Sequence, residues 1–129
     1  MIVDTSALVA IALKEPGFEA IAKALIGSRE RSMSYVSYLE YSMVLSRKPG
    51  WDSPRRIKES VELWQIQFVE FTSKHADEAI SADQRFGKGR HKAALNFGDC
   101  AAYATAKLAG EPLLYVGADF ALTDVESAL

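Results

Sequence analysis

Short apolar runs alternate along the chain with longer segments in which apolar residues recur every three or four positions. Runs this short, bounded by turn residues, predict buried strands, and the segments between them predict amphipathic helices. The predicted strands cover residues 1–3, 33–36, 67–71 and 113–116, with a weak fifth near 123–125. Strands and helices that alternate in this way form a parallel sheet covered by helices on both faces. The sequence therefore predicts a three-layer α/β/α fold.

Polar and helix-breaking residues mark the ends of the predicted helices. Ser53-Pro54 is a strong start signal, because serine caps the first N–H groups and proline fits the first turn. Ser37 is expected to open another helix, with Glu40 three residues later in the spacing of a capping box. The predicted helices cover about residues 6–13, 18–26, 37–45, 54–64, 73–86 and 99–108.

The bulk composition is that of an ordinary globular protein, with 49% hydrophobic and 25% charged residues. A length of 129 residues predicts one domain over residues 1–129. The net charge of −2 gives no overall attraction for nucleic acid, so any such binding requires a local basic patch. Cys100 is the only cysteine, and no apolar run is long enough for a membrane span. We expect a cytoplasmic protein without disulfides or a membrane anchor.

Four acidic residues stand where a predicted strand ends or a predicted helix begins: Asp4, Glu40, Asp99 and Asp119. Each has a simple explanation as a helix cap or turn residue. In a parallel sheet, however, neighbouring strand ends converge on one crevice, so these carboxylates are expected to meet. Buried carboxylates that lie close together require a compensating cation. Because all the ligands are oxygens, that cation is expected to be Mg²⁺ or Mn²⁺.

A metal held by carboxylates suits phosphate-ester chemistry, since it polarises the phosphoryl group and lowers the pKa of water. Five basic or titratable residues precede Asp99 in a loop with two glycines: Arg85, Lys88, Arg90, His91 and Lys92. Such a charge run is either solvated surface or an electrostatic grip on a phosphate backbone. The sequence leaves both interpretations open.

Four motifs in order resemble those of the PIN-domain ribonucleases, and within them the VapC toxins of bacterial toxin–antitoxin pairs. They are Met-Ile-Val-Asp-Thr-Ser-Ala at the start, Val-Ser-Tyr-Leu-Glu around Glu40, Asn-Phe-Gly-Asp-Cys-Ala around Asp99, and Gly-Ala-Asp-Phe around Asp119. The likeness spans the whole chain, and the block 87–103 is its most specific part.

The resemblance implies an endoribonuclease that depends on Mg²⁺ or Mn²⁺ and hydrolyses RNA phosphodiester bonds with metal-activated water. It implies the sheet order 3-2-1-4-5, a homodimer and an inhibitory antitoxin. The acids Asp4, Glu40, Asp99 and Asp119 match the family's metal-binding catalytic residues, with Asp124 as the alternative to Asp119. The expected substrate contacts are Thr5, Ser6, Asn96 and the loop residues Arg85, Lys88, Arg90 and His91.

The chain departs from the family pattern at two positions. Lys92 follows the Gly-Lys-Gly-Arg-His string where proline is frequent, and Ala118 precedes the last acid where asparagine is common. The segment 18–64 carries both tryptophans and three of the five tyrosines. This aromatic excess predicts a groove near the second to fourth helices that receives a helix of the antitoxin.

Two other classes of protein compete with the nuclease. A phosphatase acting on small phosphate esters also places an aspartate after its first strand, but it needs a second acid where this chain has Ser6. A PIN-like module that binds RNA or a protein without turnover would keep the fold alone. Release of phosphate from p-nitrophenyl phosphate tests the first class, and metal-dependent RNA binding without cleavage would favour the second.

Overall fold

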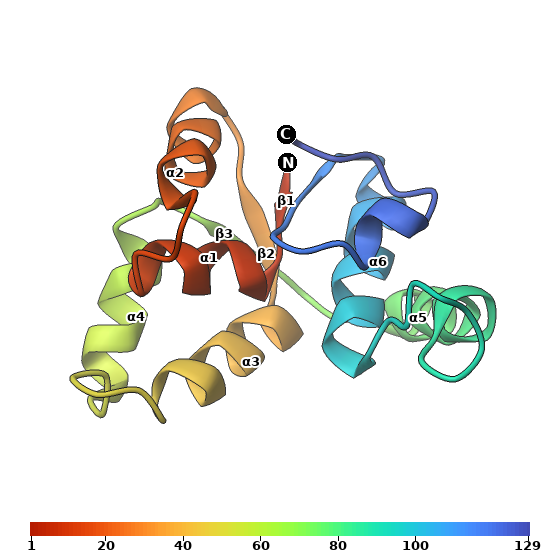
Figure 1. Ribbon diagram of the computed structural model, residues 1–129, viewed down its shortest axis with the longest axis horizontal. Coiled ribbons are helices and arrows are strands. Elements are labelled where there is room, and N and C mark those ends of the chain that lie inside the picture. Colours follow the sequence, from red (N-terminus) through yellow and green to blue (C-terminus); the bar gives the residue numbers. More distant parts are fainter.

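Helices cover both faces of a short parallel sheet. The structure is a computed structural model that describes residues 1–129. Its strands are β1 (Ile2–Val3), β2 (Ser32–Ser34), β3 (Gln67–Val69) and β4 (Leu113–Leu114). They are all parallel, in the order β3-β2-β1-β4, and Ile2 pairs with Ser32 on one side and Leu113 on the other. Figure 1 shows the strands at the centre, between helices on the left and on the right. The predicted α/β/α architecture is confirmed.

Six α-helices and one 3-10 helix connect and flank the strands. They are α1 (Thr5–Ala12), α2 (Phe18–Gly27), α3 (Tyr35–Leu45), α4 (Pro54–Glu62), α5 (Ser73–Phe86), α6 (Phe97–Ala109) and η1 (Phe120–Leu122). Ser53 caps α4 as predicted, with Pro54 in its first turn. None of these helices has the length and apolar character that a membrane crossing requires.

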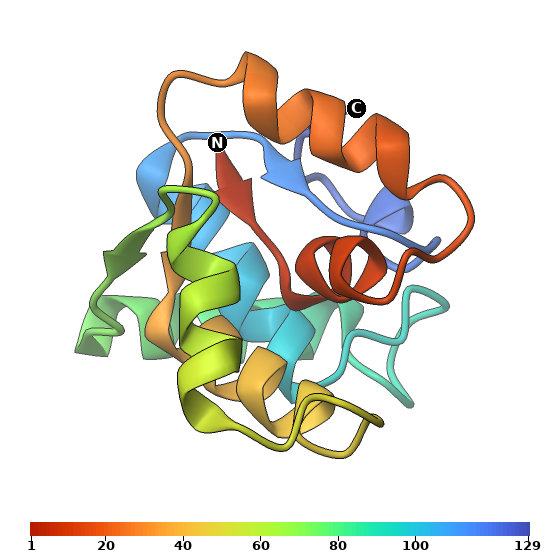
Figure 2. The same cartoon turned by 90° about the vertical axis from the view of Figure 1, so that its left-hand side faces the viewer.

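Two apolar cores lie on opposite faces of the sheet, because successive side chains of a strand point in opposite directions. Val3 and Leu114 belong to the core beneath α1, α2, α3 and α4, the side that Figure 2 turns toward the viewer. Ile2 and Leu113 belong to the core beneath α5 and α6. Residues 100–106 of α6 are all buried, and six of these seven, all except Tyr103, are cysteine, alanine or threonine with small side chains. Small side chains let α6 approach the sheet closely.

The start of α3 corrects one prediction. The helix begins at Tyr35, and its cap is Ser34, whose hydroxyl accepts hydrogen bonds from the N–H groups of Val36 and Ser37. The expected cap at Ser37, and the capping box with Glu40, are therefore wrong. Ser34 is better placed because it ends β2, whereas Ser37 is already buried in the first turn. Glu40 therefore takes no part in capping α3.

The predicted fifth strand at 123–125 is not formed. Instead, the last residues run beside β4 and make one parallel bridge, between Leu113 and Ser127. Two backbone hydrogen bonds hold it, Leu113 N to Glu126 O at 2.8 Å and Ala128 N to Leu113 O at 2.9 Å. Side chains of α5 and α6 donate hydrogen bonds to the Asp124 carboxylate. The order 3-2-1-4 is confirmed, and the C-terminal segment takes the place of strand five.

Candidate active site

Asp4 lies at the end of β1, where the chain leaves the sheet and enters α1. Its backbone N–H donates to Leu114 O at 2.9 Å, which continues the sheet by one residue. Its Oδ2 caps α1 by accepting from Ser6 N at 2.9 Å and from Ser6 Oγ at 2.5 Å. Its Oδ1 is buried and has no hydrogen-bond partner. A buried carboxylate oxygen without a donor is costly, and it is the kind of atom that a cation satisfies.

Glu40 reaches the site from α3. Thr5 Oγ1 donates to Ser37 O at 3.0 Å, and this buried bond fixes the start of α1 against α3, one turn before Glu40. From the other side, Gly98 of α6 lies so close that a Cβ atom at this position would overlap the Glu40 carboxylate. Gly98 is a site residue that sequence reasoning missed. The sequence signal for Gly98 is its position immediately before Asp99, in the first turn of a helix, where the backbone conformation does not require glycine and glycine disfavours the helix.

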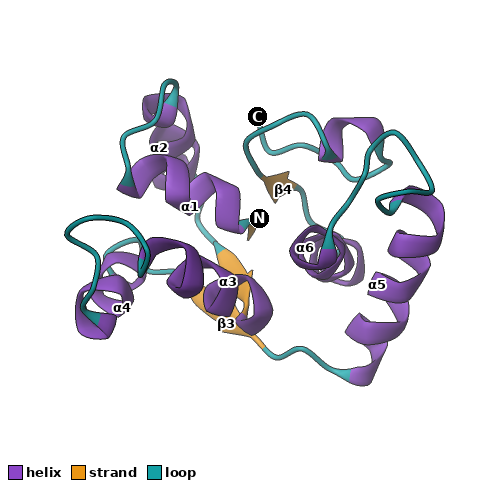
Figure 3. Cartoon of the chain, turned by 60° about the horizontal axis from the view of Figure 1, so that its bottom comes forward, coloured by secondary structure: helices purple, strands orange, loops and turns teal.

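Asp99 is held by a reciprocal pair of hydrogen bonds at the start of α6. Asn96 Oδ1 accepts from Asp99 N at 2.9 Å, and Asp99 Oδ2 accepts from Asn96 N at 3.0 Å. This capping box fixes the direction of the Asp99 side chain. Figure 3 shows α3 at the front, with α6 seen nearly end-on beside it. The Glu40 charge contributes to the raised pKa of Asp99, so the two acids face the same site from neighbouring helices.

Asp119 and Asp124, the two candidates for the fourth acid, have different surroundings. Asp119 is exposed, accepts no capping bond and lies on the loop after β4. The Ser6 hydroxyl accepts from Val116 N at 3.0 Å and so ties this loop to Asp4. Asp124 accepts instead from Tyr103 OH at 2.5 Å, Arg85 at 3.2 Å and Lys107 at 3.3 Å. These donors lower the pKa of Asp124 to about 2.

The pKa values show which carboxylates lie within electrostatic reach of one another. The pKa of Asp4 is raised from 3.8 to about 6, mainly by burial and less by the charges of Asp99 and Glu40, against the opposing Ser6 hydrogen bonds. Burial also raises the pKa of Asp99, with contributions from Asp119 and Glu40. The charged forms of Asp4 and Asp99 are therefore both destabilised by other acids of the set. Asp124 contributes to neither shift.

The donor set fits a hard divalent cation, although the side chains are not arranged around one. No three acidic, histidine or cysteine side chains are close enough together to coordinate a single ion in this structure. Uncompensated carboxylates repel one another, so a looser arrangement than the liganded one is expected. The unpartnered Asp4 Oδ1 and the raised pKa values of Asp4 and Asp99 are the features that a cation would relieve.

The polar residues expected beside the acids are occupied within the protein. Thr5, Ser6 and Asn96 make the hydrogen bonds that fix α1, Asp4 and α6. Their part in substrate binding stays a prediction. Cys100 is buried, and the pKa of its thiol is raised to about 11, so it is a protonated core residue at neutral pH.

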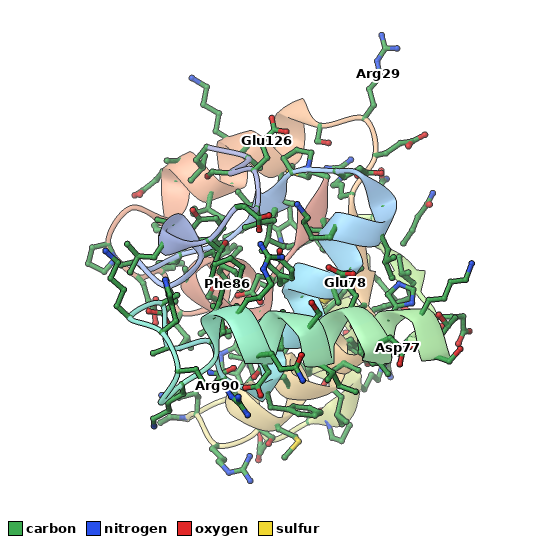
Figure 4. The ribbon with its side chains drawn as sticks, turned by 90° about the vertical axis from the view of Figure 1, so that its right-hand side faces the viewer. Arg29, Asp77, Glu78, Phe86, Arg90 and Glu126 are labelled. Carbon is green, nitrogen blue, oxygen red and sulfur yellow. The ribbon has the colours of Figure 1, made fainter.

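The basic loop before Asp99 divides into paired and unpaired cations. Arg85 pairs with Asp124 at 3.2 Å, and Arg90, near the C-terminal end of α5 in Figure 4, lies 3.6 Å from Asp83. His91 Nδ1 accepts from Ala93 N at 3.0 Å and its ring packs edge-on against Phe86. Lys88 and Lys92 are exposed and form no ion pair. Binding of RNA by this loop stays a prediction, and the two lysines are its free charges.

Comparison with known proteins identifies the family of the chain. The family model of the PIN domain matches residues 1–126. The chain therefore belongs to the PIN-domain family.

Its curated relatives carry the name VapC. Ribonuclease VapC of Mycolicibacterium smegmatis is 43% identical over 125 residues, which is 97% of each chain. Ribonuclease VapC36 of Mycobacterium tuberculosis is 44% identical over 127 residues, 98% of this chain and 91% of that one. The predicted likeness to the VapC group is confirmed.

Solved structures share the fold at low sequence identity. VapC20 of Mycobacterium tuberculosis, a toxin that cleaves the sarcin–ricin loop, has a TM-score of 0.76 at 15% identity, over 96% of this chain and 95% of that one. A toxin–antitoxin complex from Klebsiella pneumoniae has a TM-score of 0.73 at 17% identity, over 95% of this chain and 92% of that one. At such identities the likeness concerns the fold alone.

Replacing Asp4 with Asn should stabilise the metal-free protein at neutral pH. Because its folded pKa is raised, the contribution of Asp4 to stability is fully present below the unfolded pKa of 3.8 and is lost as the pH rises through about 6. A shift of this size corresponds to about 3 kcal/mol above pH 6. Asn keeps an oxygen for the cap of α1.

Urea unfolding at pH 4 and pH 7.5 measures this effect. The stability advantage of Asp4→Asn over the wild type should be largest at pH 7.5 and nearly absent at pH 4. An advantage of equal size at both pH values would show that Asp4 is not the strained group.

Proposed function

We propose that this protein is a metal-dependent endoribonuclease and acts as the toxin of a toxin–antitoxin pair. The observation that carries the proposal is the buried, unpartnered Oδ1 of Asp4, whose pKa burial and the neighbouring charges of Asp99 and Glu40 raise. Relatives at 43% and 44% identity over nearly the whole chain are ribonucleases by name, which supports RNA as the substrate.

In the proposed mechanism, Asp4, Glu40 and Asp99 hold one or two Mg²⁺ or Mn²⁺ ions, and Asp119 completes the set from the loop after β4. Such an ion would neutralise charge on the phosphodiester and lower the pKa of water. Ser6 and Asn96 act as positioning residues, because their hydrogen bonds orient Asp4 and Asp99. His91 is not the proton acceptor in this mechanism, since its Nδ1 already accepts from the backbone of its own loop.

The surroundings of Asp4 favour the nuclease over the phosphatase. The phosphatase would need an acid at position 6 to handle the proton of the leaving group. Here the Ser6 hydroxyl donates to Asp4 Oδ2 and accepts from Val116 N, so both of its functions are structural. We therefore expect no release of phosphate from p-nitrophenyl phosphate in the presence of Mg²⁺.

Purified protein should cleave RNA with Mn²⁺ and lose this activity with EDTA. Asp99→Asn should lower the cleavage rate by at least about 100-fold, because a ligand charge is lost while the capping bonds are retained. Fluorescent RNA substrates resolved on denaturing gels provide the measurement. Cleavage should leave a 5′-phosphate and a 3′-hydroxyl, by analogy with the family.

The matched control is Asp77→Asn. Asp77 is an exposed acid of α5, is labelled in Figure 4, and contributes to the raised pKa of neither Asp4 nor Asp99. It should cleave RNA at the wild-type rate. Wild-type rates from the purified Asp99→Asn protein would refute the proposed active site.

We also propose a homodimer and an antitoxin that binds beside α3 and α4. A hollow of about 250 Å³ lies between these helices, and Tyr38, Ser42, Met43 and Ile57 help to line it. Most of the aromatic excess of this segment is otherwise used internally. Tyr41 is buried and bonded to Ser60, whereas Tyr35 and Tyr38 stack on Phe68. The hollow is thus the part of the expected groove that remains open to an apolar side chain of a partner helix.

Co-expression with the neighbouring gene tests the partner. Its product should relieve growth arrest and co-purify with the tagged wild-type protein. Ser42→Arg should abolish co-purification, because a long charged side chain would fill the hollow, while the isolated variant still cleaves RNA. Unchanged co-purification of Ser42→Arg would place the antitoxin elsewhere.

A further inference from the structure

A second groove, between α3 and the first turn of α6, leads away from the acidic site. It has a volume of about 560 Å³. Its walls are apolar, with Leu39 and Met43 from α3 and Phe97 from α6. Glu40 lies along it at one end, and Arg47 and Lys48 line it at the end of α3. The groove thus connects a proposed metal ligand to two cations.

The cations at the far end are available to a ligand. Arg47 donates only to Met43 O, the last-turn carbonyl of its own helix, and forms no ion pair. Lys48 also forms none. Arg85 and Arg90, in the loop that was expected to bind RNA, are each neutralised by an aspartate. Arg47 follows Glu40 by seven residues, five of them within α3, which corresponds to about 10 Å at a helical rise of 1.5 Å per residue.

Phe97 is an aromatic side chain with no apolar cover. It is 84% exposed, the highest value among the large hydrophobic residues. It is the first residue of α6, two positions before Asp99. Phe97 also lines a different cleft, of about 600 Å³, beside α5. Lys88 is the cation that lines this cleft. Its ring therefore stands between two hollows, each with a basic side chain.

We propose that the groove between α3 and α6 binds single-stranded RNA next to the bond that is cut. A base stacks on Phe97, and Arg47 and Lys48 each contact a backbone phosphate on the side of the groove away from Glu40. Exposed aromatic rings combined with unpaired cations are the means by which proteins hold single-stranded nucleic acid. This inference rests on the proposed ribonuclease function and assigns its substrate site.

The charges of the groove favour RNA over a protein occupant. Lysine is depleted from the buried centres of protein interfaces. Glu40, the one acid that lines the groove, lies at the opposite end from Arg47 and Lys48, so a second copy of the chain would desolvate the two cations without pairing them. Phosphates of RNA neutralise such cations and leave the apolar wall for bases. The antitoxin hollow shares only Met43 with this groove, so the two sites are adjacent but separable.

Binding of short fluorescent single-stranded RNA in EDTA separates substrate binding from cleavage. The double variant Arg47→Gln/Lys48→Gln and the single variant Phe97→Ala should each bind at least about 10-fold more weakly than the wild type. Phe97→Trp should restore binding, because it retains a stacking surface. Loss of the two cations should also lower the slope of log affinity against log salt by about 1.4, or 0.7 for each phosphate contact.

Cleavage kinetics in Mn²⁺ provide the second readout. The same variants should raise KM by a similar factor and leave kcat within about threefold, as expected for groups that bind substrate without entering the chemistry. The controls are Arg29→Gln, a cation that points away from the molecule in Figure 4, and Leu63→Ala, a 78% exposed apolar residue of another surface. Both controls should behave as wild type.

The outcomes distinguish failure of the RNA-binding groove proposal from failure of the proposed ribonuclease function. Wild-type cleavage with unchanged RNA affinity in the groove variants overturns the groove and leaves the nuclease intact. Variant-sensitive RNA binding without any cleavage supports the groove and overturns the nuclease. Absence of RNA binding by the wild type overturns both. Light scattering that shows Phe97→Ala converting a dimer to a monomer would assign the groove to a second copy and overturn the proposal.

Discussion

Burial of the Asp4 carboxylate, with smaller repulsion from the neighbouring acids, is the constraint on which the rest of this structure depends. The parallel sheet brings the end of β1 to an edge where α3 and α6 also begin, so Asp4, Glu40 and Asp99 are held by three separate elements. Burial and neighbouring charges raise the pKa of Asp4 to about 6. The fold tolerates the free-energy cost of burying Asp4 because the two apolar cores stabilise the folded protein. A divalent cation would neutralise the charges of these carboxylates, so the same arrangement would serve as a binding site.

Ordinary helix-capping interactions orient this site. Asp4 caps α1, and Asn96 and Asp99 cap α6 reciprocally, so the bonds that start the helices also fix the acids. Each carboxylate uses only one oxygen, Oδ2, for its cap, which leaves the other oxygen for a ligand. The capping and metal-binding interpretations of these residues are therefore compatible, and the sequence motifs satisfy both. Gly98 completes the arrangement by leaving room for Glu40.

The sequence predicted the architecture well because strand runs, caps and breakers are local signals. Ser53-Pro54 and Gly110 define helix ends where the structure has them. The errors arose where distant residues decide. Ser34 rather than Ser37 caps α3, because the position at which β2 ends depends on its pairing with β1 and β3. Asp124 is drawn to Tyr103 and Arg85, 21 and 39 residues away, and no local pattern records those contacts. For the same reason, ion pairing of the loop arginines and the exposure of Phe97 could not be foreseen.

Titration calorimetry with Mn²⁺ on the metal-free protein tests the central claim most directly. The wild type should take up Mn²⁺ at pH 7.5, and Asp4→Asn should bind it at least about 10-fold more weakly, because it loses one ligand charge. Asp124→Asn, which alters an acid outside the site, should bind as the wild type does. No uptake of Mn²⁺ by the wild type, or equal affinity in wild type and Asp4→Asn, would contradict the account.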